Sequence, residues 1–128
     1  MRSPSFENTP LALEEVTRRR DDAGERCELS LQLPVDWEYT RGHFPGYPIV
    51  PGVAQLVAMV ERPARTLWPE LGAPRSVARL KFRRPITPGE RVRVVLERAG
   101  EQVRFSLAVG EAPCAAGIMR FSEAAGPS

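Results

Sequence analysis

The chain has 128 residues, 42% of them hydrophobic and 27% charged, with a formal net charge of +2. This composition fits one soluble globular domain and excludes extensive disorder, and no segment approaches the roughly 20 apolar residues of a membrane span. The small net charge gives no argument for nucleic-acid binding, and the amino terminus lacks an apolar signal core. We therefore expect a cytoplasmic protein with one domain at residues 9–122, between flexible tails at residues 1–8 and 123–128.

The first third of the chain predicts a hairpin. Residues 11–20 fit either a short helix or an edge strand, and the turn-forming residues 21–24 favour the strand. In residues 27–33 apolar and polar side chains alternate, which predicts a strand with one buried face.

A stiff loop surrounds His43, the single histidine. Three prolines restrict the backbone of residues 44–51. A helix with apolar residues on nearly every side is expected to begin near Pro51 or Gly52. The N–H groups of its first turn lack intrahelical partners and favour negative charge, so His43 and the Gly52 amide are a candidate base and oxyanion-binding pair. The plainer alternative is a loop histidine that caps a turn.

The end of this helix is interrupted by a proline. Pro63 removes one helical hydrogen bond, which predicts a kink or a break there, with one further turn at residues 64–68. Residues 69–74 are rich in turn formers and are expected to be a linker.

The second half predicts four strands, at residues 78–83, 91–98, 102–109 and 114–121. In the first of them the side chains predict one basic face, with Arg79, Lys81 and Arg83, and one apolar face, with Ala78, Leu80 and Phe82. The whole chain would then hold five or six antiparallel strands and one apolar helix, around which a twisted sheet must curve.

Metal and cofactor chemistry finds no support in the pattern. Cys27 and Cys114 do not stand at the spacing of metal ligands, and a zinc site takes about four ligands. Both thiols are expected to be reduced and structural, and we expect no metal and no cofactor.

Two motifs resemble one known family. The segment His43-Phe44-Pro45-Gly46-x-Pro48-x-x-Pro51-Gly52-Val53 resembles the signature of the bacterial 3-hydroxyacyl-acyl-carrier-protein dehydratases, and Val53-Ala54-Gln55-Leu56 looks most like the relatives that serve aryl polyene pigment synthesis. Lys81-Phe82-Arg83-Arg84-Pro85-Ile86-x-Pro88-Gly89 is similar to the strand and turn after the central helix of that family. The resemblance covers roughly residues 25 to 122.

The resemblance implies an α+β hotdog fold, a curved antiparallel sheet wrapped around one long central helix. It also implies a dimer whose sheets join edge to edge, with each active site between subunits. The implied reaction removes water from a 3-hydroxyacyl-acyl-carrier-protein thioester in fatty acid, polyketide or polyene pigment synthesis. His43 would be the base and the Gly52 amide would bind the thioester oxygen. The implied substrate-binding residues are Phe44, Pro51, Val53, Gln55 and Val57.

The chain departs from the family pattern at the acid. The family has Glu or Asp fourteen residues after the histidine, where this chain has Val57, which cannot transfer a proton. Three explanations are open. Glu61 lies on the same helical face and is a candidate substitute, although an ion pair with Arg65 would be its ordinary role. A partner hotdog subunit in a heterodimer would supply the carboxylate. The third explanation is a non-catalytic subunit that binds acyl chains or the carrier protein.

The carrier protein is the expected partner, beside a second hotdog subunit in a homodimer or heterodimer. Its acidic surface would be steered by opposite charge, which makes Arg79, Lys81, Arg83 and Arg84 the docking candidates. A solvated charged face is the alternative role for them. A thioesterase fits less well, because hotdog thioesterases lack the proline-bounded histidine turn.

Overall fold

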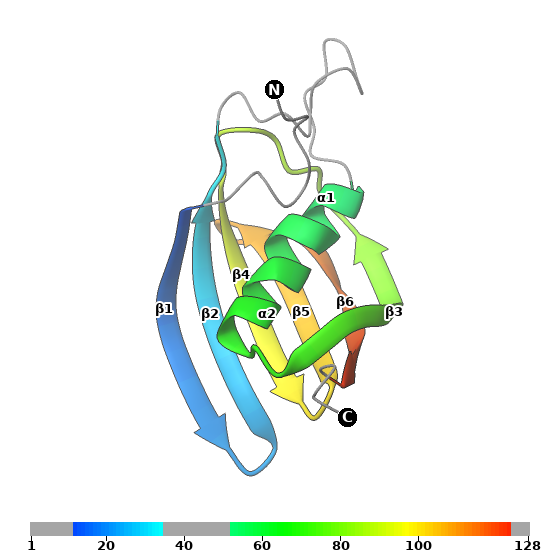
Figure 1. The fold of residues 1–128 in the computed structure, drawn as a ribbon. Coiled ribbons are helices and arrows are strands. Elements are labelled where there is room, and N and C mark those ends of the chain that lie inside the picture. The colour runs from blue at the N-terminus through cyan, green and yellow to red at the C-terminus, as the bar shows by residue number, and fades with distance from the viewer. Residues whose placement is uncertain (1–11, 35–51, 124–128) are drawn as a thin grey trace, which may run out of the picture.

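The computed structural model describes residues 12–34 and 52–123. Figure 1 shows them as one sheet that curves around a single helical rod. The strands are β1 (Ala12–Asp21), β2 (Gly24–Gln32), β3 (Leu71–Phe82), β4 (Arg91–Ala99), β5 (Gln102–Val109) and β6 (Ala112–Glu123). The rod consists of α1 (Gly52–Leu56), a π-helical turn η3 (Val57–Glu61) and α2 (Arg62–Leu67).

The sheet has the strand order β1-β2-β4-β5-β6-β3, and all neighbouring strands are antiparallel. This is the α+β hotdog arrangement that the resemblance implies, with six strands in the described part of the chain. The first strand, which the sequence left ambiguous, is a strand and lies at one edge. The other edge is β3.

The core lies between the inner, concave face of the sheet and the rod. Alternate side chains of β2, β4 and β5 are buried there, as the period-two patterns predict. They meet Met59, Val60 and Ala64 from the rod, which are at most 1% exposed. Burying one such aliphatic side chain contributes about 1.5–3 kcal/mol. The buried strand residues are Cys27, Leu29, Leu31, Val92, Val94, Leu96, Val103, Phe105 and Leu107.

The β1–β2 turn is built as the sequence predicts. The Asp21 carboxylate accepts the N–H groups of Ala23 at 2.8 Å and Gly24 at 3.2 Å. Gly24 has φ +143°, and a Cβ there would lie 1.9 Å from the carbonyl oxygen of Arg98. A side chain at this position would therefore collide with the neighbouring strand.

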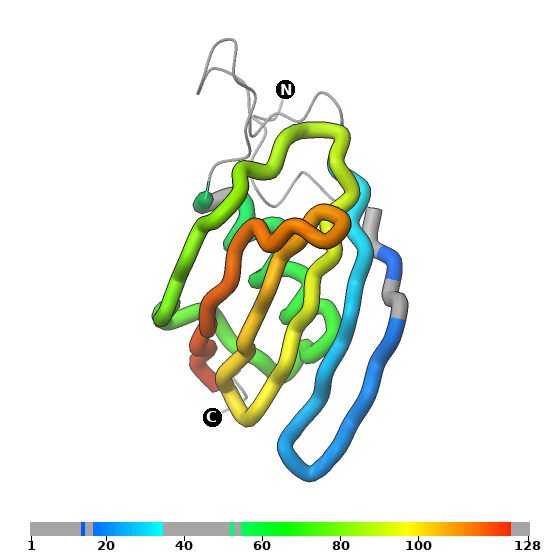
Figure 2. Tube along the Cα trace, turned by 180° about the vertical axis from the view of Figure 1, so that it is seen from behind, coloured from blue at the N-terminus to red at the C-terminus, as the bar shows by residue number. Residues whose placement is uncertain are grey.

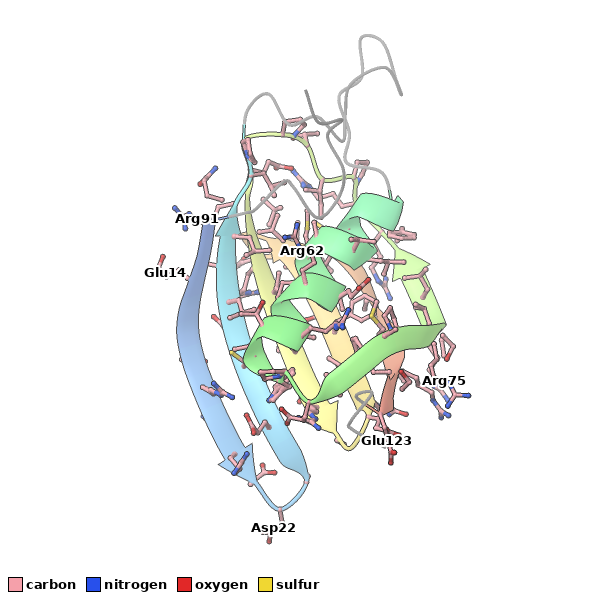
Figure 3. All side chains as sticks on the ribbon, in the orientation of Figure 1. Glu14, Asp22, Arg62, Arg75, Arg91 and Glu123 are labelled. Atoms are coloured by element: carbon pink, nitrogen blue, oxygen red, sulfur yellow. The ribbon has the colours of Figure 1, made fainter. Side chains whose placement is uncertain are left out.

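The linker predicted at residues 69–74 is wrong from Leu71 onward, because β3 already begins there. Leu71 is buried, and Pro74 pairs with Phe121 at a register irregularity. An edge strand tolerates proline, since one side of it needs no ladder hydrogen bond. Figure 1 shows β3 bending sharply before it runs beside β6, and Figure 3 places Arg75 at this bend.

A bulge interrupts β3 further on, and it corrects the two predicted faces. Ala78 pairs with Ile118 and Lys81 with Ala116, so two residues of β3 face one of β6. Arg79 in the bulge has φ +54°, a left-handed conformation that is uncommon for a side chain other than glycine. Because the extra residue shifts the alternation, Ala78 and Lys81 share the outer face while Phe82 faces inward.

The predicted kink or break at Pro63 does not break the rod. The backbone angles stay helical at Glu61 and Arg62, and Pro63 lies at the start of α2, where its missing N–H costs little. The irregularity appears one turn earlier as η3, in which the Arg62 N–H bonds to the Val57 carbonyl oxygen. The rod ends at Leu67, capped by the Trp68 N–H on the Ala64 carbonyl at 2.8 Å.

Charged side chains close the far end of the rod, and we call them the helix-end cluster. The Glu25 carboxylate accepts hydrogen bonds from the Trp68 indole at 3.0 Å and from Arg18 at 3.1 Å. Arg20 donates to the same carboxylate. The Trp68 bond has the largest effect and the Arg20 bond the next, and together with the Arg18 bond they lower the pKa of Glu25 to about 2. The Arg98 guanidinium lies 5.8 Å from the centre of the Trp68 ring. The cluster consists of Arg18, Arg20, Glu25, Trp68, Glu70 and Arg98.

Several predictions lie outside the described residues, among them the loop with His43, Phe44 and Pro51 and the tail at residues 1–8. Glu123, predicted to begin the second tail, is still in β6. No described helix is long and apolar enough to cross a membrane. Cys27 and Cys114 are buried, and neither forms a disulfide bond in the described part of the chain.

Candidate active site

The rod begins at Gly52, beside an aromatic side chain of the edge strand. A Cβ at Gly52 would lie 2.9 Å from Cζ of Phe82, so the ring packs against the glycine and leaves no space for a side chain. Phe82 is 50% exposed although it faces the inner side of the sheet. The sequence predicted Gly52, but it placed Phe82 on an apolar strand face without a role. The available signal was its position inside the second motif.

Three predicted substrate-binding residues follow within the first turns of the rod. Gln55 is 4% exposed, the one fully buried polar side chain in the described residues. Val57 is partly buried and begins the π turn. Val53 belongs to α1. Neither valine can exchange a proton, so these two positions supply no acid.

Glu61, the candidate substitute acid, makes an ion pair within the rod. Its carboxylate lies 3.5 Å from the Arg65 guanidinium, one turn on, and its side chain is 23% exposed. This is the ordinary role that the spacing also allowed.

The four basic docking candidates separate into two groups. Arg84 makes a two-pronged ion pair with Glu90, at 2.8 Å and 3.2 Å. Glu90 also accepts the Thr87 N–H at 2.8 Å, and the Arg84 bond is the main cause that lowers the pKa of Glu90 to about 2. Arg84 therefore holds the loop between β3 and β4, whereas Arg79, Lys81 and Arg83 are exposed.

These three exposed residues line a hollow of about 470 Å³, which we call the basic hollow. Arg104 of β5 lies in it as well, and Glu97 of β4 contributes the one carboxylate among its described lining residues. The lining residues place the hollow on the outer face of the sheet, the face that lies away from the rod. Figure 2 views the molecule from that side, with the strands in front of the rod. Arg104 was not among the predicted docking residues, although its place between Val103 and Phe105 predicts that it faces outward.

Comparisons with known proteins identify the family of the chain. The family model ApeI-like, described as ApeI dehydratase, matches residues 18–118. The chain belongs to the ApeI-like dehydratase family. The match includes the rod, most of the sheet and both motifs that carried the resemblance.

Individual relatives of this ApeI-like chain point the same way. It is 38% identical over 105 residues to the 3-hydroxyacyl-[acyl-carrier-protein] dehydratase FabZ of Acidiphilium cryptum, which covers 68% of this chain. The chain spans 64% of that relative's length. The chain is thus similar to a 3-hydroxyacyl-acyl-carrier-protein dehydratase over part of that protein's length.

Solved structures share the fold of the ApeI-like chain. An uncharacterized protein from Erwinia carotovora is 29% identical, with a TM-score of 0.74 over 88% of this chain and 97% of its own. The dehydratase heterocomplex ApeI:P from Xenorhabdus doucetiae is 24% identical, with a TM-score of 0.72 over 88% of this chain and 99% of its own. At that identity the second likeness speaks for the fold alone.

Proposed function

We propose that this protein dehydrates 3-hydroxyacyl-acyl-carrier-protein thioesters to the enoyl product in fatty acid, polyketide or polyene pigment synthesis. The observation that carries the proposal is the start of the rod at Gly52, beside Phe82 and inside the family-matched segment. His43 precedes Gly52 by nine residues within the same motif.

In the proposed reaction, His43 removes a proton from the carbon next to the thioester carbonyl. A neutral imidazole suits this task, because its ordinary pKa is near 6.5. The negative charge that develops on the thioester oxygen is bound by the Gly52 N–H, at the positive end of the rod. The bond from the third carbon to the hydroxyl oxygen breaks, and an acid protonates that oxygen so that it leaves as water.

The acid is proposed to come from a partner hotdog subunit. Val57 has no proton to give, and the Glu61 carboxylate is engaged by Arg65 at 3.5 Å. The edge strand β3 supports a partner, because Leu80 is 38% and Phe82 is 50% exposed there, and unpaired strand edges favour strand addition. A heterodimer, in which a sister subunit brings the carboxylate, is therefore favoured over the use of Glu61.

The test measures loss of water from a 3-hydroxyacyl carrier-protein thioester, with the purified protein alone and with a neighbouring hotdog protein added. We expect turnover to rise on addition and His43→Ala to lower it by about 10²- to 10⁴-fold. Glu61→Gln, which keeps the size of the side chain, is expected to change turnover less than twofold. Unchanged turnover in His43→Ala would refute the histidine assignment, and a loss in Glu61→Gln matching that of His43→Ala would identify Glu61 as the acid.

A second candidate function is a non-catalytic subunit that binds acyl chains or the carrier protein. The observation that favours it is Val57 at the position of the family acid. It predicts that no partner restores turnover, while the protein still binds the acylated carrier.

A further inference from the structure

The basic hollow gathers four cations that the rest of the described protein leaves without carboxylate partners. Arg79, Lys81, Arg83 and Arg104 are exposed, and no ion pair found in the described part of the chain includes them. Glu97 of β4 stands opposite Arg104 in the ladder and offsets this charge in part, although no ion pair found in the described part of the chain joins the two. Elsewhere in the same part, Arg20, Arg84 and Arg98 each contact a carboxylate. The hollow is thus a concentrated positive surface with the capacity to bind an acidic partner.

The backbone brings these cations together from segments far apart in the sequence. Arg104 is paired with Ile118, which is in turn paired with Ala78, one residue before the bulge. The bulge then places Lys81 on this same outer face. A regular strand would have put Ala78 and Lys81 on opposite faces, so the concentration of charge depends on the bulge.

The hollow also lies next to the proposed catalytic end of the rod. Lys81 and Arg83 flank Phe82, and Phe82 packs against Gly52 from the inner face. Neighbouring strand residues are about 3.3 Å apart along the chain. A partner seated on the outer face would therefore lie beside Phe82 along β3, on the opposite side of the sheet from the rod start. Edge-to-edge pairing of β3 with another subunit uses backbone groups and leaves this outer face accessible.

We propose that the basic hollow is the docking surface for the acidic acyl carrier protein, with Arg104 as an anchor that the family motif does not contain and with Arg84 excluded. This inference rests on the proposed function for the identity of its partner. It goes beyond that function in assigning the surface and in separating two adjacent arginines by role.

The experiment measures the dissociation constant of a fluorescently labelled 3-hydroxyacyl carrier protein by anisotropy. Arg104→Glu is expected to raise this dissociation constant about 5- to 20-fold. Lys81→Glu makes the same kind of charge change at a second exposed residue of the hollow and should also raise the constant. The control is Arg93→Glu, which makes the same charge change at an exposed residue of β4 outside the hollow. It should change the constant less than twofold. Equal effects of Arg104→Glu and Arg93→Glu would overturn the proposal.

Kinetics separate this inference from the proposed function. Arg104→Glu should lower kcat/KM for the carrier-bound substrate more than for the same acyl group on N-acetylcysteamine, whereas Arg93→Glu should leave the ratio of the two unchanged. If the wild-type protein turns over neither substrate with any partner, the proposed function fails while the binding measurement still tests the hollow. The ratio of kcat/KM for the carrier-bound substrate to kcat/KM for the N-acetylcysteamine substrate is the decisive quantity. If this ratio is the same in Arg104→Glu as in wild type, carrier docking at the hollow is contradicted.

Discussion

The helix-end cluster and the basic hollow are both rich in arginine, but they differ in what the arginines face. In the cluster, Arg18 and Arg20 converge on Glu25, and Arg98 reaches Glu70. In the hollow, four cations share one nearby carboxylate, that of Glu97, without contacting it. Paired charge supports the fold because each group keeps a hydrogen-bonding partner when it leaves water. Unpaired charge gives little stability and remains available to a partner.

The largest effect on stability is expected from the centre of the cluster. Glu25→Gln keeps the size of the side chain but removes the charge that receives the Trp68 indole and two arginines. The free energy of unfolding should fall by about 2–3 kcal/mol, measured by urea denaturation. The control is Glu28→Gln, three residues further along β2 and on its outer face. It should change the free energy of unfolding by less than about 0.5 kcal/mol. Equal losses would show that the cluster is not a special support.

Acid should remove the same support gradually. The pKa of Glu25 is about 2 in the folded protein against an ordinary 4.5, so the folded state favours the ionised carboxylate. Its contribution is complete above about pH 4.5 and is lost as the pH falls towards 2. Denaturation midpoints measured from pH 6 to pH 2 should fall less steeply in Glu25→Gln than in wild type. Parallel curves for the two proteins would contradict the lowered pKa.

A smaller loss is expected when the donor to Glu25 is changed. Trp68→Phe keeps an aromatic ring in the buried position but removes the indole N–H that lies 3.0 Å from Glu25. We expect a loss of about 1–2 kcal/mol in the free energy of unfolding. Combined with Glu25→Gln, the change should cost less than the sum of the two single effects, because both remove one interaction. Strict additivity would mean that the hydrogen bond contributes nothing.

Two adjacent arginines give the most direct comparison between paired and unpaired charge. Arg84→Gln breaks the ion pair with Glu90 and should lower the melting temperature by a few degrees. Arg83→Gln should leave the melting temperature unchanged but weaken carrier binding. Calorimetry measures the melting temperature of the two variants, and anisotropy measures their affinity for the carrier protein. The assignment of Arg84 to stability and Arg83 to binding is wrong if both variants change the same one of these two quantities.

The smallest effect on stability is expected inside the hollow. Arg104→Gln should change the free energy of unfolding by less than about 0.5 kcal/mol, because the loss of its attraction to Glu97, the residue opposite it on β4, is offset by relief of repulsion from the other cations of the hollow. Raising the salt concentration should weaken carrier binding, since exposed charges are screened, and leave urea denaturation nearly unchanged. A destabilised Arg104→Gln would assign that arginine to the fold.

The sequence alone determined most of the strand positions, while the hotdog arrangement was what the resemblance to the dehydratase family implied. It did so because period-two burial and turn residues are local properties, visible in stretches such as residues 24–33 and 91–109. It also located Gly52 at the start of the rod through the family motif. Its predictions for His43, Phe44 and Pro51 stay predictions, because these residues lie outside the described part of the structure.

Tertiary structure decided the features that depend on pairing between distant segments. The bulge at Arg79 exists only in the register of β3 against β6, and it moved Ala78 and Lys81 onto one face. The rod continues through Pro63 because the π turn before it changes the hydrogen bonding. Which arginines have partners was likewise invisible in the sequence, since Arg83 and Arg84 are identical neighbours and only the folded loop brings Glu90 to one of them.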